Sequence, residues 1–413
     1  MTWRISALAL LMGSALGVQM TRADTIVVSP TGSYRSVAAA VRAAPAGSRI
    51  VVEAGTYREP SIVIDKPLEL VGEGRPVLEG RDPSTLIRVV ADDVAVRGLV
   101  LAHVPPSNLE ERAALKFEGA HRCVAEALEI RDAPFGIYAA EAADCHIANN
   151  VVRGSGSLGT AGNAIHLWSS SRMTVRDNVV SGHRDGLYFE FVRDTSIEGN
   201  LSEANLRYGM HFMFSHGCTY RDNHFVRNGA GVAVMYTHGV TIERNEFRAN
   251  RGPAAYGLLL KDISESRIDG NRFDDNTVGL LIEGGGHLTI RGNSFTRNGW
   301  ALKLMANSPF NRVEQNVFAG NSFDVGTNSR STVATVVGNW WDRYRGYDLD
   351  RDGRGDVPFR PVRLFSLLVA NQPGSVILMR SLFVDLLDAA ESALPVLTPD
   401  ALADTAPAMA VPR

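Results

Sequence analysis

Methionine and histidine side chains recur at matching places in the middle of this 413-residue sequence. Met213 and Met235 each stand four residues after a glycine, and His216 and His238 each stand three residues after one of these methionines. His211 lies two residues before Met213. Thioether sulfur and imidazole nitrogen both bind copper, and thioethers favour Cu(I) in particular. The sequence therefore predicts a copper-binding surface, provided that the fold brings the two segments side by side.

A regular repeat indicates how these segments are positioned. Asparagine recurs with gaps of 22 to 28 residues, at Asn150, Asn178, Asn200, Asn223, Asn245, Asn271, Asn293 and Asn316. Between successive asparagines lies a glycine followed by a short apolar strand. A period of about 22 residues with several short strands is typical of the coils of a parallel β-helix. We expect an all-β, right-handed parallel β-helix of about 22–23 residues per coil over residues 24–338, with the asparagines stacked at its turns.

Alternation along each strand separates core residues from outward ones. The first and third residues after the glycine are apolar, as Met210 and Phe212 are, so we expect them to face the core. The second and fourth must then point outward, because side chains alternate along a strand. The outward residues of successive coils are His166, Trp168, Tyr188, Glu190, His211, Met213 and Met235. Outward aromatic and methionine side chains also suit a docking surface, which we expect the first four of these to form.

The ends of the repeat region have their own signals. Residues 1–23 have the basic start, apolar stretch and small final residue of a secretory signal peptide, which predicts export. Ser36–Ala44 is rich in alanine and is expected to form a short helix that caps the first coil. The net charge of −3 argues against nucleic-acid binding, which needs clustered Lys and Arg. Three cysteines cannot form a disulfide framework in so long a chain, and whether Cys123 and Cys145 are bridged stays open.

The C-terminal part departs from the repeat. Residues 339–363 form an Asp-rich loop that closes the solenoid, and residues 364–391 are expected to be a helical docking segment. Ser375–Leu387 is its strongest helix candidate, and the apolar side chains expected to contact a partner are Leu378, Phe383 and Leu387. The Pro373-Gly374 pair would let the chain turn before that helix. Residues 392–413 are rich in Ala and Pro and are expected to be disordered.

The Asp-rich loop contains alternating carboxylates. Asp348, Asp350 and Asp352 stand immediately before Gly353, and Asp356 follows, a spacing that resembles the oxygen ligands of a calcium loop. The position where a bidentate glutamate would stand is Phe359. A partial calcium loop and a stack of Asx turns without metal therefore both remain open.

This loop, together with the coils before it, resembles the NosD family of periplasmic β-helical maturation factors of nitrous-oxide reductase. The most specific parts of the resemblance are residues 339–362, Gly209-Met-His-Phe-Met-Phe-Ser215 and Gly231-Val-Ala-Val-Met-Tyr236. The resemblance implies a periplasmic, non-enzymatic role in assembling the copper centres of that reductase. It also implies partners: the NosF ATPase and NosY permease of an ABC transporter, the apo-reductase, and a copper chaperone as a further candidate. Membrane association would be peripheral, through the permease.

Two other classes of function suit a secreted β-helix. A polysaccharide lyase, hydrolase or epimerase is suggested by fold analogy alone, and cleavage of a glycoside generally needs two nearby carboxylates. The outward carboxylates Glu190 and Glu283 lie four coils apart, and no Asn-Thr-Asp motif occurs. A carbohydrate-binding or adhesion module would need an aromatic platform, for which this face offers Trp168 and Tyr188. The copper-handling hypothesis therefore stands first.

Overall fold

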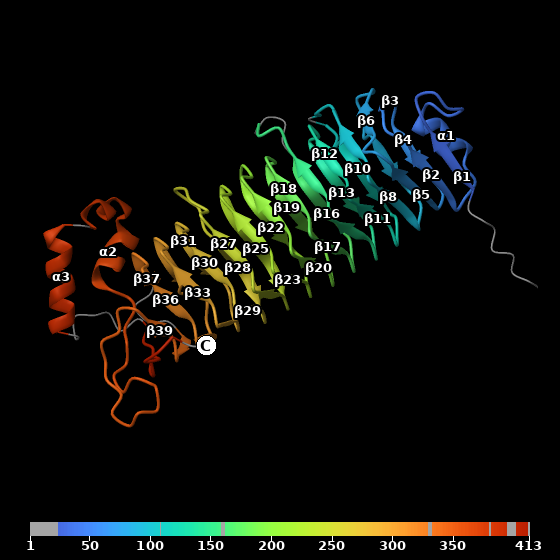
Figure 1. Ribbon diagram of the computed structural model, residues 1–413. Coiled ribbons are helices and arrows are strands. Elements are labelled where there is room, and N and C mark those ends of the chain that lie inside the picture. Colours follow the sequence, from blue (N-terminus) through green and yellow to red (C-terminus); the bar gives the residue numbers. More distant parts are fainter. Residues whose placement is uncertain are drawn as a thin grey trace, which may run out of the picture.

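The chain folds mainly into a long solenoid (Figure 1). The structure is a computed structural model and describes residues 24–107, 109–157, 162–328, 333–379, 381–394 and 402–411. Each turn adds one strand to each of three parallel sheets, which hold 14, 13 and 12 strands and are named here sheets A, B and C. The all-β, right-handed parallel β-helix predicted from the repeat is therefore confirmed. The predicted signal peptide lies outside the described residues.

The strands of each sheet follow one another in chain order along the solenoid. Sheet A holds β1 (Thr25–Val28), β2 (Ser48–Val52), β5 (Leu68–Gly72), β8 (Val94–Arg97), β11 (Val124–Glu126), β14 (His146–Ala148), β17 (Thr174–Arg176), β20 (Ser196–Glu198), β23 (Thr219–Arg221), β26 (Thr241–Glu243), β29 (Arg267–Asp269), β32 (Thr289–Arg291), β35 (Asn311–Glu314) and β38 (Ala334–Val337). Sheet B holds β3 (Thr56–Glu59), β6 (Val77–Gly80), β9 (Val100–Ala102), β12 (Glu129–Arg131), β15 (Val151–Arg153), β18 (Val179–Ser181), β21 (Leu201–Glu203), β24 (His224–Val226), β27 (Glu246–Arg248), β30 (Arg272–Asp274), β33 (Ser294–Thr296), β36 (Val317–Ala319) and β39 (Trp340–Trp341). Sheet C holds β4 (Ile62–Ile64), β7 (Ile87–Val89), β10 (Ala113–Glu118), β13 (Phe135–Ala140), β16 (Asn163–Trp168), β19 (Asp185–Glu190), β22 (Tyr208–Met213), β25 (Ala230–His238), β28 (Leu258–Ser264), β31 (Val278–Glu283), β34 (Trp300–Leu304) and β37 (Phe323–Gly326).

Inward side chains fill the solenoid as the alternation predicts. Leu187, Phe189, Met210 and Phe212 are all buried in one continuous core. Because coils are about 4.8 Å apart, like side chains stack on one another along the axis. The longest aromatic stack in the described core is Phe225, Phe247, Phe273, Phe295, Phe318 and Trp341. This repetition stabilises the register of neighbouring coils.

The predicted asparagine column is a hydrogen-bonded ladder. Each buried side-chain oxygen accepts from the backbone N–H and the side-chain amide of the asparagine in the preceding coil. Asn245, for example, accepts both bonds from Asn223. A second ladder, which the sequence analysis missed, runs beside it through Asn205, Asn228, Asn250, Asn276, Asn298 and Asn321. Its signal was present in the sequence, because each member stands five residues after a member of the first column.

The N-terminal end is capped as predicted. Helix α1 (Val37–Ala43) begins after Ser36, whose hydroxyl accepts from the backbone of Ala39. The buried carboxylate of Glu59 accepts from the backbone N–H groups of Val37 and Ala38 at 2.6 and 3.2 Å. A carboxylate suits the positive end of the helix dipole. The helix thereby covers the first coil of the solenoid.

The C-terminal helices do not form the single helix expected over Ser375–Leu387. Helix α2 (Leu364–Asn371) is followed by a 3-10 helix, η1 (Pro373–Leu378), and by α3 (Leu382–Ala393). The chain does turn at Pro373, because proline cannot continue the preceding helix. Within the described part of the chain, no helix combines the length and the apolar character needed to cross a bilayer.

The expected disorder of residues 392–413 is wrong for residues 402–411. This segment returns to the last coil, where Asp404 forms a parallel bridge with Val336 and an antiparallel bridge with Phe359. Asp404 is fully buried. Composition alone predicted a tail without a core, but a single buried carboxylate and backbone pairing attach it to the solenoid.

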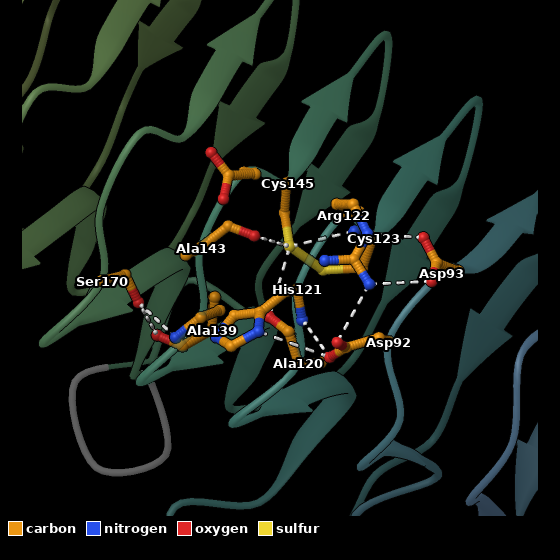
Figure 2. Close-up of a disulfide and its surroundings, with 12 residues drawn as sticks. Asp92, Asp93, Ala120, His121, Arg122, Cys123, Ala139, Ala143, Cys145 and Ser170 are labelled. Atoms are coloured by element: carbon orange, nitrogen blue, oxygen red, sulfur yellow. Dashed lines mark hydrogen bonds and ion pairs between the residues drawn. A yellow bond between two sulfur atoms is a disulfide. The ribbon is translucent and has the colours of Figure 1, made fainter.

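A disulfide joins two adjacent coils near the N-terminal third of the solenoid. Cys123 and Cys145 are bonded, with their Cα atoms 4.5 Å apart (Figure 2). Both are fully buried. The same figure shows His121 and Arg122 nearby on the surface, where Arg122 pairs with Asp92 and Asp93. The question left open by the sequence is thus answered by a bridge that ties neighbouring coils together.

Candidate functional site

Two methionines lie side by side on the outer face of sheet C. Met213 on β22 and Met235 on β25 are direct register partners, and both are partly exposed. Their neighbours in the same column are Glu190 on one side and Lys261 on the other. The predicted adjacency is confirmed: two thioethers from successive coils face solvent between an acidic and a basic residue.

The histidine pair at the following turn is also adjacent. The rings of His216 and His238 stack with their centroids 4.0 Å apart and their planes at 24°. The Nδ1 atom of His216 accepts from the backbone N–H of His238 at 3.3 Å. Partial burial, with the nearby His238 charge, lowers the pKa of His216. Imidazole lone pairs lie in the ring plane, so two stacked rings do not point at one ion, and chelation would require one ring to turn.

His211 points outward but is covered. Its ring packs against Tyr188 and Tyr208, with centroids 5.2 and 4.8 Å away, and only 8% of the residue is exposed. Its Nδ1 atom lies 3.4 Å from Nη2 of Arg207, which can only donate, so the neutral ring carries its proton on Nε2. Burial lowers the pKa of His211 to about 4. Nε2 therefore offers no lone pair in this arrangement, and copper binding by His211 would require the Arg207 contact to break.

His166 also points outward but is covered. Its ring stacks on Tyr138 at 4.3 Å and meets the edge of Tyr188 at 4.7 Å, and burial lowers its pKa to about 3. Alternation gave the direction correctly, but bulky rings on neighbouring coils cover one another. A row of aromatic and histidine rings consequently runs along the outer face of sheet C.

The four residues expected to form a docking face lie together. His166, Trp168, Tyr188 and Glu190 line one recess on this outer face. The Tyr188 hydroxyl donates to Oε2 of Glu190 at 3.2 Å. Carboxylate and hydroxyl are thus held together at the edge of the recess. Docking of a partner on these residues stays a prediction.

An exposed aromatic row was missed by the sequence analysis. In three successive coils, the residue directly after Glu190, Met213 or Met235 is aromatic: Phe191, Phe214 and Tyr236. Their rings stack, with successive centroids 5.4 and 5.0 Å apart. All three have left-handed backbones, with φ of 56, 48 and 55°, a region that costs roughly 1–2 kcal/mol per non-glycine residue. The equivalent corner elsewhere holds Ser169 or Asp262. Three large, exposed rings at a strained corner mark a candidate contact surface beside the methionine pair.

The apolar residues of the C-terminal segment divide between two faces. Leu387 packs against a cluster that includes Trp300 and Phe323 of sheet C and Phe365 of α2. Leu378 and Phe383 are exposed instead. Their apolar character alone could not separate them, because the packing of the helices on sheet C decides which side chain is covered.

The Asp-rich loop brings three of its carboxylates together. Oxygens of Asp348, Asp350 and Asp352 lie within 4.8 Å of one another. The backbone N–H of Asp352 lowers the pKa of Asp350, but the neighbouring Asp352 carboxylate and some desolvation raise it, and the net shift is upward. Asp356 instead accepts from the backbone of Leu349. Asx-type bonds such as that from Gly353 N–H to Asp348 order the loop, and calcium binding stays a prediction.

A buried carboxyl near the C-terminal coils predicts a pH effect on stability. Burial raises the pKa of Asp324 to about 6, and the charge of Arg343 only partly opposes this. An unfolded aspartate titrates near 4, so the folded chain loses stability as the pH rises from about 4 to about 6. We expect Asp324→Asn to stabilise the protein above pH 6 by up to about 3 kcal/mol and to have no effect near pH 4.

Melting temperatures of the wild type and Asp324→Asn across this pH range would check the prediction. Asparagine keeps the oxygen that accepts from Asn321, so the comparison isolates the charge. Asp65→Asn, at a side chain that is 66% exposed, is the matched control and should leave the pH profile unchanged. An equal effect of Asp324→Asn at both ends of the range would contradict it.

Solved structures resemble the solenoid at low sequence identity. The A-module of the mannuronan C-5 epimerase AlgE6 from Azotobacter vinelandii matches 71% of this chain and 84% of its own length, with a TM-score of 0.52 and 16% identity. Such a likeness supports the parallel β-helix and carries no further conclusion about chemistry.

Sequence comparison is more specific. A family profile described as periplasmic copper-binding protein (NosD) matches residues 155–346, which contain both methionines. A Pseudomonas aeruginosa PAO1 protein named "Probable ABC transporter binding protein NosD" is 31% identical over 382 residues, covering 87% of each chain. The protein of the same name from Stutzerimonas stutzeri is 29% identical over 383 residues, covering 87% of this chain and 86% of its own length. The chain therefore belongs to the NosD family.

Proposed function

We propose that this protein is a periplasmic accessory factor that receives and presents copper during assembly of the copper centres of nitrous-oxide reductase. Its family is described as periplasmic and copper-binding, and its relatives are named as ABC transporter binding proteins. Under this proposal its partners are the NosF ATPase, the NosY permease, the apo-reductase and a copper chaperone. Copper is the cargo, held transiently on the outer face of sheet C.

The observation that carries the proposal is the register of Met213 and Met235. Two partly exposed thioethers on paired strands supply soft ligands that favour Cu(I). Two ligands leave the ion open, so a donor or acceptor protein can complete its coordination during transfer. His216 follows β22 and His238 is the last residue of β25, so the stacked pair lies close to the methionines along the chain and would add a nitrogen ligand once a ring turns. The exposed row of Phe191, Phe214 and Tyr236 offers the apo-reductase a contact surface beside the ion.

Cu(I) binding tests the proposal. We expect the purified protein to bind Cu(I) in competition with a calibrated chelator, and Met213→Ala with Met235→Ala to weaken binding at least about tenfold. Both side chains are outward, so folding should be unaffected. Met305→Ala is the matched control, because Met305 occupies the equivalent outward place on a later coil without a methionine partner. Equal copper affinity in the double variant and the wild type would exclude the pair as the site.

We further propose that η1 and α3 dock on the transporter. Ile377, Leu382 and Phe383 are 86, 73 and 54% exposed, a large apolar surface for so short a segment. The ion pair of Arg363 with the buried Glu391 ties α3 to the start of α2, and Phe365 of α2 and Val384 of α3 belong to the apolar cluster on sheet C. The apolar surface of the segment is therefore presented from a defined position at the end of the solenoid, as Figure 1 shows for α3.

Loss of these apolar contacts is expected to release the protein from its membrane partner. Ile377→Ser with Phe383→Ser should reduce co-purification with the permease at least about tenfold. Burial of each apolar side chain in the interface would contribute roughly 1.5–3 kcal/mol to binding. Phe310→Ser is the control, because Phe310 is 61% exposed on a different part of the solenoid. Undiminished co-purification of the double variant would place docking elsewhere.

A further inference from the structure

The recess on sheet C has features that neither copper transfer nor a flat docking surface explains. Its volume is about 400 Å³, within the range of roughly 300–1,000 Å³ typical of small-molecule sites. It lies over β13, β16 and β19, one coil before the methionine pair begins. Its lining does not include Met213 or Met235, although Glu190 is the register partner of Met213.

A long connection brings one acidic residue to this recess. Between sheets B and C, the coil of β13 needs only residues 132–134, whereas the preceding coil uses residues 103–112. This longer connection carries Glu111 to the recess, where its carboxylate accepts a hydrogen bond from the Tyr138 side chain. In solenoids, insertions into single repeats commonly gather on the binding face. The sequence could not reveal this wall, because Glu111 lies outside the repeated strand positions.

The inner side of the recess holds a buried donor without a protein partner. Nδ1 of His166 lies 3.3 Å from the amide nitrogen of Asn163, while the Asn163 oxygen accepts from Arg184. This pair of contacts makes Nδ1 an acceptor and places the ring proton on Nε2. Nε2 of His166 has no hydrogen-bond partner, whereas Nε of Arg184 faces the carboxylate of Asp185. Unsatisfied buried donors are costly, which is typical of a place that a ligand completes.

The lining of the recess also includes acidic and aromatic groups. Glu111 and Glu190 supply carboxylates, and Trp168 supplies a partly exposed indole that no neighbouring aromatic ring covers among the described residues. The guanidinium of Arg184 lies 3.7 Å from the buried Asp185, which offsets its charge. The recess as a whole therefore does not favour anions such as phosphates, and its charged lining does not favour an apolar ligand.

We propose that this recess binds a sugar ring that carries no negative charge. Sugar hydroxyls both donate and accept, so they can donate to Glu111 and Glu190 while accepting from Nε2 of His166. The apolar C–H face of a pyranose can pack on Trp168. A metal ion is not supported, because the described residues contain no metal-type cluster of His, Cys, Asp or Glu there. The proposal is independent of copper handling and rests on different residues.

Saturation-transfer NMR with the purified protein tests the sugar site. The probes are D-glucose, N-acetyl-D-glucosamine and chitotriose, each at about 10 mM, an order of magnitude above a millimolar dissociation constant. We expect transfer to at least one probe and a signal at least fivefold weaker in Trp168→Ala and in Glu190→Gln. D-galacturonate should give a weaker signal than the neutral sugars. Phe310→Ala, an exposed aromatic far from the recess, should leave the signal unchanged.

The remaining outcomes would overturn the proposal. Absence of transfer to all three neutral probes would exclude a sugar site. Equal transfer in the wild type, Trp168→Ala and Glu190→Gln would place sugar binding elsewhere. If the two variants lose binding to the apo-reductase but no sugar binds, the recess holds a protein side chain instead. Copper affinity, measured in Trp168→Ala, should match the wild type, so failure here is distinguishable from failure of the copper proposal.

Discussion

Replacing Asp404 with alanine is expected to unfold the last coil of the solenoid locally. The fully buried carboxylate accepts from the backbone N–H of Gly338 and Asn339, the side-chain amide of Asn339 and the indole N–H of Trp341, at 3.0–3.1 Å. Each buried donor left without a partner costs roughly 1–3 kcal/mol. The C-terminal tail would also lose these side-chain bonds to the last coil and would be held there mainly by backbone pairing. We therefore expect a local loss of about 4 kcal/mol.

Hydrogen exchange is the appropriate measurement, because solenoids open coil by coil and need not unfold in a single step. Protection of the amides of Asn339 and Trp341 should fall at least about a hundredfold, whereas protection near Asn223 should be unchanged. Met409→Ala, in the same tail at a residue that is 40% exposed, is the matched control. Unaltered protection in Asp404→Ala would show that the tail does not stabilise this end.

The place of Asp404 follows from the chemistry of the ladder. Inside the ladder every side chain must both accept from one coil and donate to the next, which an amide can do. At the end only acceptance is required, and a carboxylate supplies more acceptor sites than an amide. Asp404→Asn should therefore be tolerated better than Asp404→Ala but should still lower protection. Asp404 does not belong to the repeat, because it lies after the C-terminal helices in a segment that folds back onto the last coil.

The sequence predicted the architecture far better than the surroundings of the site. Spacing alone gave the solenoid and the adjacency of Met213 with Met235, because stacking at about 4.8 Å makes equivalent positions neighbours. It did not give the burial of His166 and His211, which depends on ring sizes in adjacent coils. Nor did it give the Glu111 wall of the recess, which comes from an irregular connection. Features set by the period were predictable, and features set by its interruptions were not.

The interior of the ladder should tolerate neither alanine nor aspartate. At Asn245, the side-chain oxygen accepts from the backbone and side chain of Asn223, and the amide donates to Tyr220 and Glu243 carbonyls and to Asn271. Asn245→Ala removes all of these bonds inside a buried site and is expected to cost about 3–5 kcal/mol. Melting temperature and exchange at Asn223 would report the loss.

Asn245→Asp distinguishes hydrogen bonding from mere filling of space. The carboxylate could still accept from Asn223, but it would face the carbonyl oxygens of Tyr220 and Glu243 without a donor, inside a buried site. We therefore expect it to be at least as destabilising as Asn245→Ala, the reverse of the order at Asp404. Arg244→Ala, beside it on an exposed ion pair with Asp222, should cost no more than about 1 kcal/mol. If Asn245→Asp were as stable as the wild type, the hydrogen bonds that Asn245 donates would not explain why asparagine is needed at this position. The contrast with Asp404 would then need another cause.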